Sequence, residues 1–313
     1  MPKEFWKNKK VCVTGGKGFL GKYLVNKLKE QGAKVFSFSL KEYDLRKLED
    51  CKKVVEGQEI VIHLAAVVGG IEFNRLNPGS IYFDNMSINT NILEAARQAN
   101  VEKFVGIGSA CAYPKHAQIP LKEENLFDGP PEETNNSYGY TKRMLAVQSK
   151  AYNKQYGLNT INLLLFNLYG PGDHFGSKNS HVIPALITKC FKGNSDLLVW
   201  GDGTPSRSFL YVEDAIEGIM LATEKCNSSD PVNIGTSEEV TIKALTEKIK
   251  DYTNFQGKIV WDTTKPNGQP RRCADTIKAK ELFGFEAKTP LHIGLKRTIE
   301  WYKNEKEGNA SHT

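Results

Sequence analysis

The sequence predicts an α/β fold, with a doubly wound parallel sheet and a smaller α/β lobe beside it. In the first half of the chain, short β-rich runs alternate with helical patterns. Several of those runs are apolar throughout, as expected for parallel strands buried on both faces. After Asn167 the composition changes to a segment rich in Gly, Asn and Ser, which indicates a long loop leading out of the first lobe.

The elements of the first half follow from these patterns. Strands are expected at Lys10–Thr14, Lys34–Ser39, Ile60–Leu64, Phe104–Gly108 and Asn159–Phe166. Helices are expected between them at Leu20–Gln31, Leu45–Glu56, Asp84–Asn100 and Asn136–Tyr156. Each strand–helix–strand step has about the length that a parallel crossover needs, which predicts the doubly wound sheet.

The second half of the chain shows fewer patterns that indicate helices or strands. The loop NLYGPGDHFGSKNS (167–180) precedes an expected helix at His181–Phe191. Val232–Gly235 resembles another short strand, and Thr241 is a suitable N-cap for a helix at Ile242–Thr253. The chain is therefore expected to return to the sheet near 208–237 and to leave it again.

Composition narrows the class of protein. At 313 residues the chain is long for one core, which favours a large domain plus a lobe. No run of 18 apolar residues occurs, and the charged N-terminus lacks the apolar centre of a secretion signal, so we expect neither a membrane span nor export. The six cysteines are scattered without a CxxC pair, so we expect a cytoplasmic protein without a disulfide framework or metal site.

The net charge of +6 raises the question of a nucleic-acid partner. Lys and Arg are spread along the whole chain and are mixed with Asp and Glu, which is typical of an ordinary solvated surface. We therefore expect no nucleic-acid partner. A slightly basic surface also suits small anionic ligands such as dinucleotides and sugar nucleotides.

A glycine-rich segment, TGGKGFLG, joins the first expected strand to the first expected helix. Gly15 permits a tight turn, Gly18 lets the backbone approach a pyrophosphate, and Gly21 allows close helix–strand packing. The helix N-terminus adds partial positive charge. In this context the segment predicts a Rossmann-type dinucleotide-binding domain.

The choice between NAD and NADP is made at the end of the second strand, where NAD enzymes place an acidic residue on the ribose. This chain has Ser39, Leu40 and Lys41 there, and Lys17 lies inside the glycine loop. Two cations without a carboxylate favour the extra phosphate of NADP. Asp44 is expected to face the adenine.

A tyrosine and a lysine four residues apart form the second motif. Tyr138 opens a long expected helix with Lys142 on the same face, and it follows a strand that ends at Ser109. An ammonium group there is expected to lower the pKa of the phenol from about 10, making Tyr138 an acid/base. The spacing alone means little, because the chain has four matches, at Tyr23, Tyr43, Tyr138 and Tyr302.

Together with HLAA (63–66), these motifs resemble the extended short-chain dehydrogenases/reductases. Six longer strings make the chain similar to the GDP-L-fucose synthase family within that group. They are GSACAYPK (108–115), NNSYGYTKRM (135–144), NLYGPGDHF (167–175), SHVIPALI (180–187), VWGDGTPSRSFLYVED (199–214) and DTTKPNGQPRR (262–272). The resemblance covers nearly the whole chain.

This resemblance implies an NADPH-dependent enzyme that inverts C3 and C5 of GDP-4-keto-6-deoxy-D-mannose and then reduces C4 to give GDP-L-fucose. It implies Cys111 and His181 as the proton-transfer pair. It implies a reduction triad of Ser109, Tyr138 and Lys142. The positions matching those that hold the GDP-sugar are Lys189, Trp200, Arg207 and Asn267, the last standing where the family usually has Asp.

The cofactor contacts implied by the motifs lie at the ends of successive strands. They are Gly15, Gly16, Lys17, Gly18, Phe19, Leu20, Gly21, Ser39, Lys41, Asp44, Leu64, Ala65, Ala66, Lys142, Phe166, Asn167, Leu168 and His181. We therefore expect residues 1–168 and 208–237 to form the NADP-binding domain. Residues 169–207 and 238–313 are expected to form the substrate lobe, with the site in the cleft between the two.

The residue types suit the implied chemistry. Hydrogens beside a ketone are acidic, so inversion needs one group to remove a proton and another to return one on the opposite face. A thiol and an imidazole, with free pKa values near 8.5 and 6.5, can share that work at neutral pH. Tyr138 and Ser109 would stabilise the enolate oxygen at C4, and Tyr138 would then donate a proton during reduction.

Some features leave alternatives open. Val67 stands where bacterial relatives often have Lys, and Lys189 replaces a frequent Arg. Related enzymes with the same strings act on other GDP-sugars, including deoxyheptoses, and some only reduce. A C4 reductase or an epimerase of another GDP-linked 4-keto sugar therefore stays an alternative, and a non-catalytic dinucleotide-sensing protein is a remote one. By analogy, helices 84–100 and 136–156 would pair in a homodimer.

Overall fold

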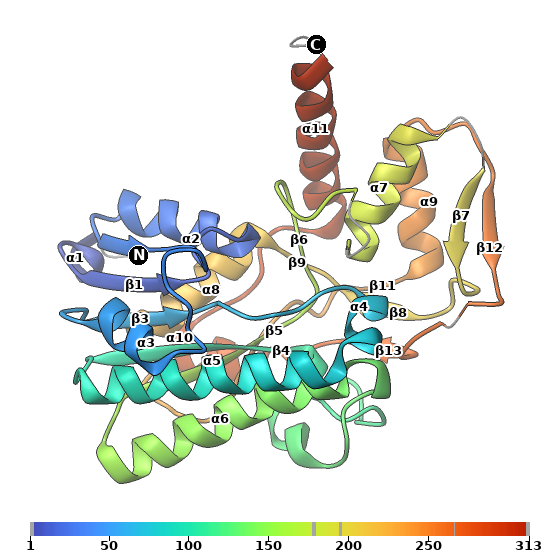
Figure 1. The fold of residues 1–313 in the computed structure, drawn as a ribbon. Coiled ribbons are helices and arrows are strands. Elements are labelled where there is room, and N and C mark those ends of the chain that lie inside the picture. The colour runs from blue at the N-terminus through green and yellow to red at the C-terminus, as the bar shows by residue number, and fades with distance from the viewer. Residues whose placement is uncertain (1–2, 177–179, 194–195, 266, 311–313) are drawn as a thin grey trace.

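The computed structural model describes residues 3–176, 180–193, 196–265 and 267–310. Its centre is a parallel sheet with the strand order β10-β5-β4-β3-β1-β2 (Figure 1). The strands are β1 (Lys10–Thr14), β2 (Lys34–Ser37), β3 (Ile60–His63), β4 (Lys103–Ser109), β5 (Thr160–Leu165) and β10 (Val232–Ile234). The strand order reverses between β1 and β3, so the predicted doubly wound sheet is confirmed. The carboxyl ends at this reversal are where such sheets bind ligands.

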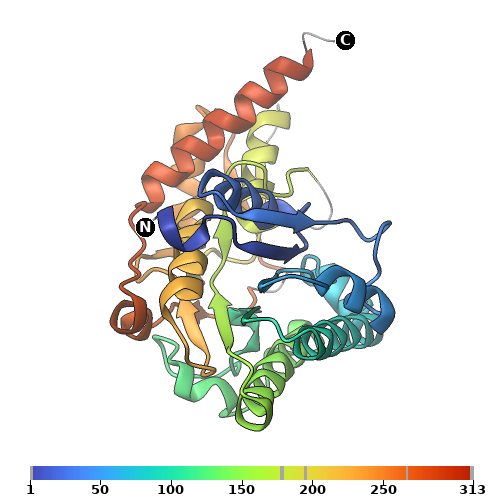
Figure 2. The same cartoon turned by 90° about the vertical axis from the view of Figure 1, so that its left-hand side faces the viewer.

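Helices cover both faces of the sheet. On one face lie α2 (Phe19–Glu30), α8 (Val212–Lys225) and α10 (Ile277–Phe283), whose core includes Val13, Leu24 and Ile219. On the other lie α3 (Leu48–Val55), α5 (Pro78–Gln98) and α6 (Asn136–Tyr156), whose core includes Val61, Ile92 and Leu145. Helices α5 and α6 run side by side along this second face (Figures 1 and 2).

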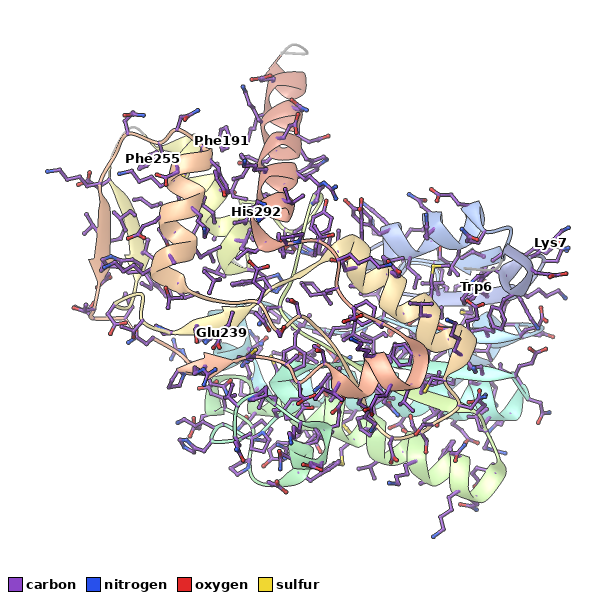
Figure 3. The ribbon with its side chains drawn as sticks, turned by 180° about the vertical axis from the view of Figure 1, so that it is seen from behind. Trp6, Lys7, Phe191, Glu239, Phe255 and His292 are labelled. Carbon is purple, nitrogen blue, oxygen red and sulfur yellow. The ribbon has the colours of Figure 1, made fainter. Side chains whose placement is uncertain are left out.

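A second lobe packs around its own core. It contains α7 (Val182–Lys192), α9 (Ile242–Tyr252) and α11 (Leu291–Ala310), with Ile187, Leu245 and Leu295 buried between them. Strand β7 (Leu197–Trp200) pairs with β12 (Ile259–Asp262), and β8 (Ser206–Ser208) lies between β11 (Glu239–Thr241) and β13 (Arg271–Arg272). Phe191 and Phe255 belong to this lobe, and Figure 3 shows them at the opposite end of the molecule from Trp6. Trp6 is a buried residue of the short helix α1 (Lys3–Trp6).

Short elements fill the space around the sheet's carboxyl edge. Strands β6 (Leu168–Tyr169) and β9 (Leu210–Tyr211) pair as the chain leaves and re-enters the first lobe. The helix α4 (Ile71–Leu76) precedes α5, and three 3-10 turns follow β4: η1 (Ala110–Ala112), η2 (Glu123–Phe127) and η3 (Glu133–Asn135). These elements carry the loops in which the candidate site is built.

The predicted and observed bounds differ at helix starts. Helix α5 begins at Pro78 rather than Asp84, because proline at the first helical position needs no N–H partner. Helix α3 begins at Leu48 rather than Leu45, because a turn closed by Lys47 N–H donating to Asp44 O occupies the preceding residues. The predicted cap at Thr241 is confirmed, since its Oγ1 accepts from Ala244 N–H at 3.1 Å. Of the predicted loop 167–180, residues 177–179 lie outside the described residues.

Among the described residues, no helix combines the length and the apolar composition that crossing a membrane requires. Within the same residues, no group of three or more His, Cys, Asp or Glu side chains is arranged to hold a metal ion.

Candidate active site

The glycine loop is shaped by close backbone packing. Gly15 has φ +69°, in the left-handed region that glycine favours, and a Cβ there would meet Ala65 N at 2.9 Å. A Cβ on Gly21 would overlap the carbonyl oxygen of Gly15. Helix α2 therefore starts directly against the end of β1, and the segment after β3 lies beside the same turn.

The N-terminus of α2 is open to an anion. Its N-cap is Gly18, which offers no side-chain hydrogen bond, and the first turn carries no acidic residue. The first amide groups of a helix have no partner within the helix, and the helix dipole makes this end partly positive. The loop thus fits the pyrophosphate of a dinucleotide.

At the end of β2 the structure corrects one part of the sequence interpretation. Ser39 donates both its backbone N–H and its hydroxyl to Glu42 Oε2, each at 2.7 Å. Lys17 also acts on this carboxylate and lowers the pKa of Glu42, although the hydrogen bonds from Ser39 lower it more. A carboxylate, which the sequence interpretation excluded here, therefore lies beside Ser39. It is supplied by an exposed residue three positions further on.

The carboxylate of Asp44 is also hydrogen-bonded within the protein. Its carboxylate accepts from the Arg46 guanidinium at 2.8 and 2.9 Å, and that contact lowers the pKa of Asp44. The same guanidinium reaches Asp84 Oδ1 on α5 at 3.3 Å. Sequence reasoning missed Arg46, the cation that pairs with both carboxylates.

Ser109 and Cys111 meet the start of α6 where β4 ends. Cys111 N–H donates to Ser109 Oγ at 3.2 Å, which caps the η1 turn. A Cβ on Gly139 would overlap the carbonyl oxygen of Cys111, so α6 packs directly on this turn. Tyr138 is the neighbour of that glycine and lies close enough for Cys111 to act on its ionisation. The structure thus brings Ser109, Cys111 and Tyr138 together.

The electrostatics of Tyr138 and Lys142 differ from the prediction. Burial raises the pKa of Tyr138, so the expected lowering was wrong for this structure. Lys142 Nζ lies 5.5 Å from the centre of the Tyr138 ring and donates to Ile107 O at 2.8 Å instead of to the phenol. Burial also lowers the pKa of Lys142 to about 8. Desolvation therefore decides the charge state of the phenol, and Tyr138 holds its proton.

A buried chain of polar side chains connects the glycine loop with α6. Thr14 Oγ1 is 2.7 Å from His63 Nδ1, and His63 Nε2 is 3.0 Å from Asn89 Oδ1. Asn89 Nδ2 donates to Thr141 O at 3.2 Å, and Thr141 Oγ1 donates to Tyr138 O at 2.8 Å. Burial lowers the pKa of His63 to about 3, so its ring is neutral. Sequence reasoning used HLAA only as a motif and missed this role for its histidine.

Arginine side chains surround Cys111 on the side of the second lobe. Arg272 Nη1 lies 3.6 Å from Cys111 Sγ, and Gln269 Oε1 holds the guanidinium at 2.9 and 3.0 Å. Burial lowers the pKa of Arg207 to about 10, with a smaller contribution from Arg272, and the thiol of Cys111 also acts on it. Sequence reasoning predicted Arg207 but missed Arg272. The string ending in two arginines was the available signal.

His181 belongs to a different part of the site. It is the N-cap of α7, its side chain is 58% exposed, and its Nδ1 lies 3.6 Å from Asp173 Oδ2. The loop that carries Asp173 is tied to the first lobe, since Tyr23 of α2 donates its hydroxyl hydrogen to Pro171 O at 2.9 Å. Among the described residues, no hydrogen bond or ion pair joins His181 to Cys111.

The predicted sugar-nucleotide residues do not all share one pocket. Lys189 lines a cavity of about 460 Å³ between α7 and β7, with Ser180, Thr188 and Leu198, and its Nζ donates to Leu198 O at 2.7 Å. This volume suits a small-molecule ligand. Trp200 is half exposed on β7, with Lys265 Nζ 5.7 Å from its ring.

The other two predicted substrate residues lie apart from that cavity. Asn267 Oδ1 accepts from Asp202 N–H at 2.9 Å, in the turn after β7. Arg207 lies on β8 near Cys111. The predicted set therefore spans from the α7–β7 cavity to the thiol.

Three more of the predicted cofactor contacts, Phe166, Asn167 and Leu168, line the exit from β5. Phe166 is fully buried, and Asn167 adopts φ +27° while its Nδ2 donates to Ser208 O at 2.7 Å. Leu168 pairs with Leu210 across β6 and β9. These bonds hold the crossing between the two lobes in one conformation.

Comparisons with known proteins give matches over most of the chain. Residues 11–235 match the model of the NAD dependent epimerase/dehydratase family. The chain is 38% identical to a probable GDP-L-fucose synthase from Oryza sativa subsp. japonica, covering 95% of this chain and 92% of that one. It is 34% identical to the GDP-L-fucose synthase of Escherichia coli, covering 94% and 96%.

Solved structures are similar to this chain over nearly its whole length. A GDP-L-fucose synthetase from Naegleria fowleri bound to NADP has a TM-score of 0.87 and 32% identity, covering 96% of both chains. A GDP-mannoheptose C4 reductase from Campylobacter jejuni with NADP bound has a TM-score of 0.86 and 29% identity, covering 97% of this chain and 99% of that one.

Proposed function

Because the chain belongs to the NAD dependent epimerase/dehydratase family, and to the GDP-L-fucose synthases within it, we propose that its site produces GDP-L-fucose. The reaction is the NADPH-dependent conversion of GDP-4-keto-6-deoxy-D-mannose by inversion at C3 and C5, followed by reduction at C4. The observation that carries the proposal is the packing of the start of α6, which bears Tyr138, onto the turn of Ser109 and Cys111 at the end of β4. A thiol and a phenol beside one carbonyl serve both stages.

The residues present fit NADP. The open N-terminus of α2 would hold the pyrophosphate, and Lys17, Ser39 and Lys41 would hold the extra phosphate. Lys142 and the segments 64–66 and 166–168 would hold the remainder, with His181 at the far side. When bound, NADPH supplies the hydride that reduces C4.

Inversion uses Cys111 and His181. At C3 or C5 the C–H bond breaks, its proton moves to the Cys111 thiolate, and its electron pair spreads onto the C4 oxygen. His181 then delivers a proton to the opposite face of that carbon. The Arg272 guanidinium, 3.6 Å from Sγ, stabilises the thiolate that begins this step.

Reduction uses Tyr138. Its raised pKa keeps the phenol protonated, which is the form needed to donate to the C4 oxygen as negative charge grows there. Ser109 donates a second hydrogen bond to the same oxygen. Lys142, whose pKa is about 8, supplies positive charge behind the phenol at neutral pH.

The two lobes divide the binding work in this proposal. Residues 1–168 and 208–237 bind NADP, and 169–207 and 238–313 bind the GDP-sugar. The nucleotide enters the α7–β7 cavity beside Lys189 and extends from it toward Trp200 and Asn267, while Arg207 lies toward the sugar. This arrangement sets the sugar ring between Cys111 and His181.

The test is product analysis in heavy water. The protein is incubated with NADPH and GDP-4-keto-6-deoxy-D-mannose in D2O, and NMR determines the configuration of the product and its deuterium at C3 and C5. We expect the L-sugar with deuterium at both carbons. The Cys111→Ser variant should block inversion while sparing some direct reduction. Unchanged fucose formation by that variant would contradict the role of the thiol.

A C4 reductase of another GDP-linked sugar is the second candidate. The similarity to the C4 reductase from Campylobacter jejuni favours it. NADPH consumption without deuterium at C3 or C5 would select this candidate. Absence of NADPH consumption across a panel of GDP-linked keto sugars would instead select the remote alternative of a dinucleotide-sensing protein.

We also propose a homodimer in the cytoplasm. Exposed apolar side chains lie on the two neighbouring helices, with Tyr82 and Phe83 on α5 and Val147 and Tyr156 on α6. Covering them supports pairing of α5 and α6 with a second copy. The six free cysteines suit a reducing compartment. Light scattering in solution tests the dimer.

A further inference from the structure

Asp173 is a buried carboxylate that the reaction described above leaves without a role. It lies in the loop after β6, its side chain is 1% exposed, and histidines lie on both sides of it. Its Oδ1 accepts from the backbone N–H of His174 at 2.7 Å. Within the described part of the chain no hydrogen bond reaches Oδ2, and His181 Nδ1 lies 3.6 Å from that oxygen.

The carboxylate is held in its charged form. Burial alone would raise the pKa of Asp173, but contacts with His174 and His181 outweigh burial and leave the pKa below its usual range. An ionised, buried oxygen without a donor is costly, so Oδ2 needs a proton donor. His181 Nδ1–H is the donor within reach.

The loop around Asp173 is fixed from both lobes. Asp173 N–H donates to Gly170 O at 3.3 Å and Phe175 N–H donates to Asp173 O at 3.0 Å. Phe175 stacks on Tyr302 of α11 with ring centres 4.7 Å apart. The carboxylate therefore has a defined position relative to the N-terminus of α7, which a group that orients another side chain requires.

We propose that Asp173 is a positioning residue that holds His181 in the Nδ1–H tautomer and leaves Nε2 as the nitrogen that exchanges protons with the sugar carbon. The inference rests on the proposed function, because it deepens the role of His181 in inversion. When Nε2 is also protonated, the carboxylate stabilises the imidazolium, which then gives its Nε2 proton to the carbon and returns to the neutral ring. The same logic orients the histidine in carboxylate–histidine pairs of other enzymes.

The first experiment uses Asp173→Asn with His174→Gln as its matched control. His174 and His181 both contact the carboxylate of Asp173, but only His181 is assigned to catalysis. We expect Asp173→Asn to slow deuterium uptake at C3 and C5 about 100-fold, in the range of acid–base contributions. The product should shift toward a reduced sugar that is not inverted. His174→Gln should keep near wild-type uptake, and NADPH binding, measured by fluorescence, verifies that each variant is folded.

A second experiment reads the tautomer in the wild-type protein, so its main result does not require Asp173→Asn to fold. With ¹⁵N-labelled histidine, NMR assigns the tautomer of His181 in the wild-type protein by comparison with His181→Asn. We expect Nδ1–H in the wild type, and a shift toward Nε2–H in Asp173→Asn. A wild-type Nε2–H tautomer, or wild-type deuterium uptake in Asp173→Asn, overturns the inference about Asp173. If wild-type protein takes up no deuterium, the proposed function fails instead.

Discussion

The surroundings of Tyr138 and of His181 differ in their access to solvent. Tyr138 is 9% exposed and Lys142 is buried beneath it, whereas the side chain of His181 is 58% exposed. In the inner region burial decides the charge states, since it raises the pKa of Tyr138 and lowers that of Lys142. At the rim, contacts with carboxylates, such as Ser39 with Glu42 and His181 with Asp173, decide which donors and acceptors stay available. The comparison predicts that mutations in the inner region lower activity and stability more than mutations at the rim do.

Replacement of Tyr138 by Phe tests the inner region most directly. The variant keeps the ring in its buried place but removes the proton donor, so NADPH oxidation with the keto sugar should fall by about 10²–10⁴. Single-turnover absorbance at 340 nm measures this loss. Replacement of exposed Tyr156 on the same helix by Phe is the control. A Tyr138→Phe rate close to that of the wild type would mean that another group protonates C4.

The pH dependence of stability tests the burial of Lys142. Its folded pKa of about 8 lies below the usual 10.5, so the unfolded chain binds more protons between these pH values. Stability of the wild type should therefore rise with pH in this window. The free energy of unfolding of Lys142→Met, expressed relative to that of the wild type, should therefore fall by at most about 3 kcal/mol as the pH rises from 8 to 10.5. Urea unfolding at several pH values measures the difference.

The control for this series is Lys150→Met, which removes an exposed lysine of the same helix. The difference in free energy of unfolding between Lys150→Met and the wild type should not fall as the pH rises from 8 to 10.5. A flat difference for Lys142→Met as well would show that burial does not govern the charge of Lys142.

Replacement of Arg272 tests the boundary between the buried inner region and the exposed rim. Removing its guanidinium takes away a charge 3.6 Å from Cys111 Sγ, so Arg272→Gln should slow alkylation of Cys111 by iodoacetamide at neutral pH, by roughly tenfold. The other five cysteines are buried, so mass spectrometry follows one thiol. Arg271→Gln is the control, because Arg271 pairs with Glu239. Equal alkylation rates in both variants would remove Arg272 from the site.

Glu42 gives the smallest expected effect. Its carboxylate occupies the donors of Ser39 that the extra phosphate of NADP would use, so Glu42→Gln should tighten NADPH binding severalfold and change NADH binding less. Fluorescence titration at low salt measures both affinities. Glu49→Gln, on an exposed face of α3, is the control. Weaker NADPH binding by Glu42→Gln would show that this carboxylate assists the cofactor.

Sequence reasoning predicted best where the signal is local. Strand β1 and helix α6 have the predicted bounds, because continuous apolar runs and helical periodicity depend on neighbouring residues. The strands β7 and β12 were missed, since each is short and their pairing joins residues far apart in the chain. The same holds within the site. The contact of Ser109 with Cys111 is local, whereas Arg272 reaches Cys111 only through the fold of the second lobe.

The charge states were the least predictable part. A lysine four residues after a tyrosine suggested a lowered phenol pKa, but the sequence does not reveal how deeply both groups are buried. Likewise, Ser39 and Lys41 suggested a site without a carboxylate, but the turn at 39–42 brings Glu42 back onto Ser39. In both cases the deciding quantity is three-dimensional.

The route of the chain through the sheet limits how the molecule can be dissected. Strand β10 joins the sheet beside β5 only after the polypeptide has passed through α7 and β7. A fragment ending before Val232 would expose the edge of β5 at Leu163–Leu165, where every second residue would lose the partner of its backbone amide and carbonyl, a geometry prone to aggregation. Minimal cofactor-binding versions should therefore be made by internal excision with a short linker, not by truncation.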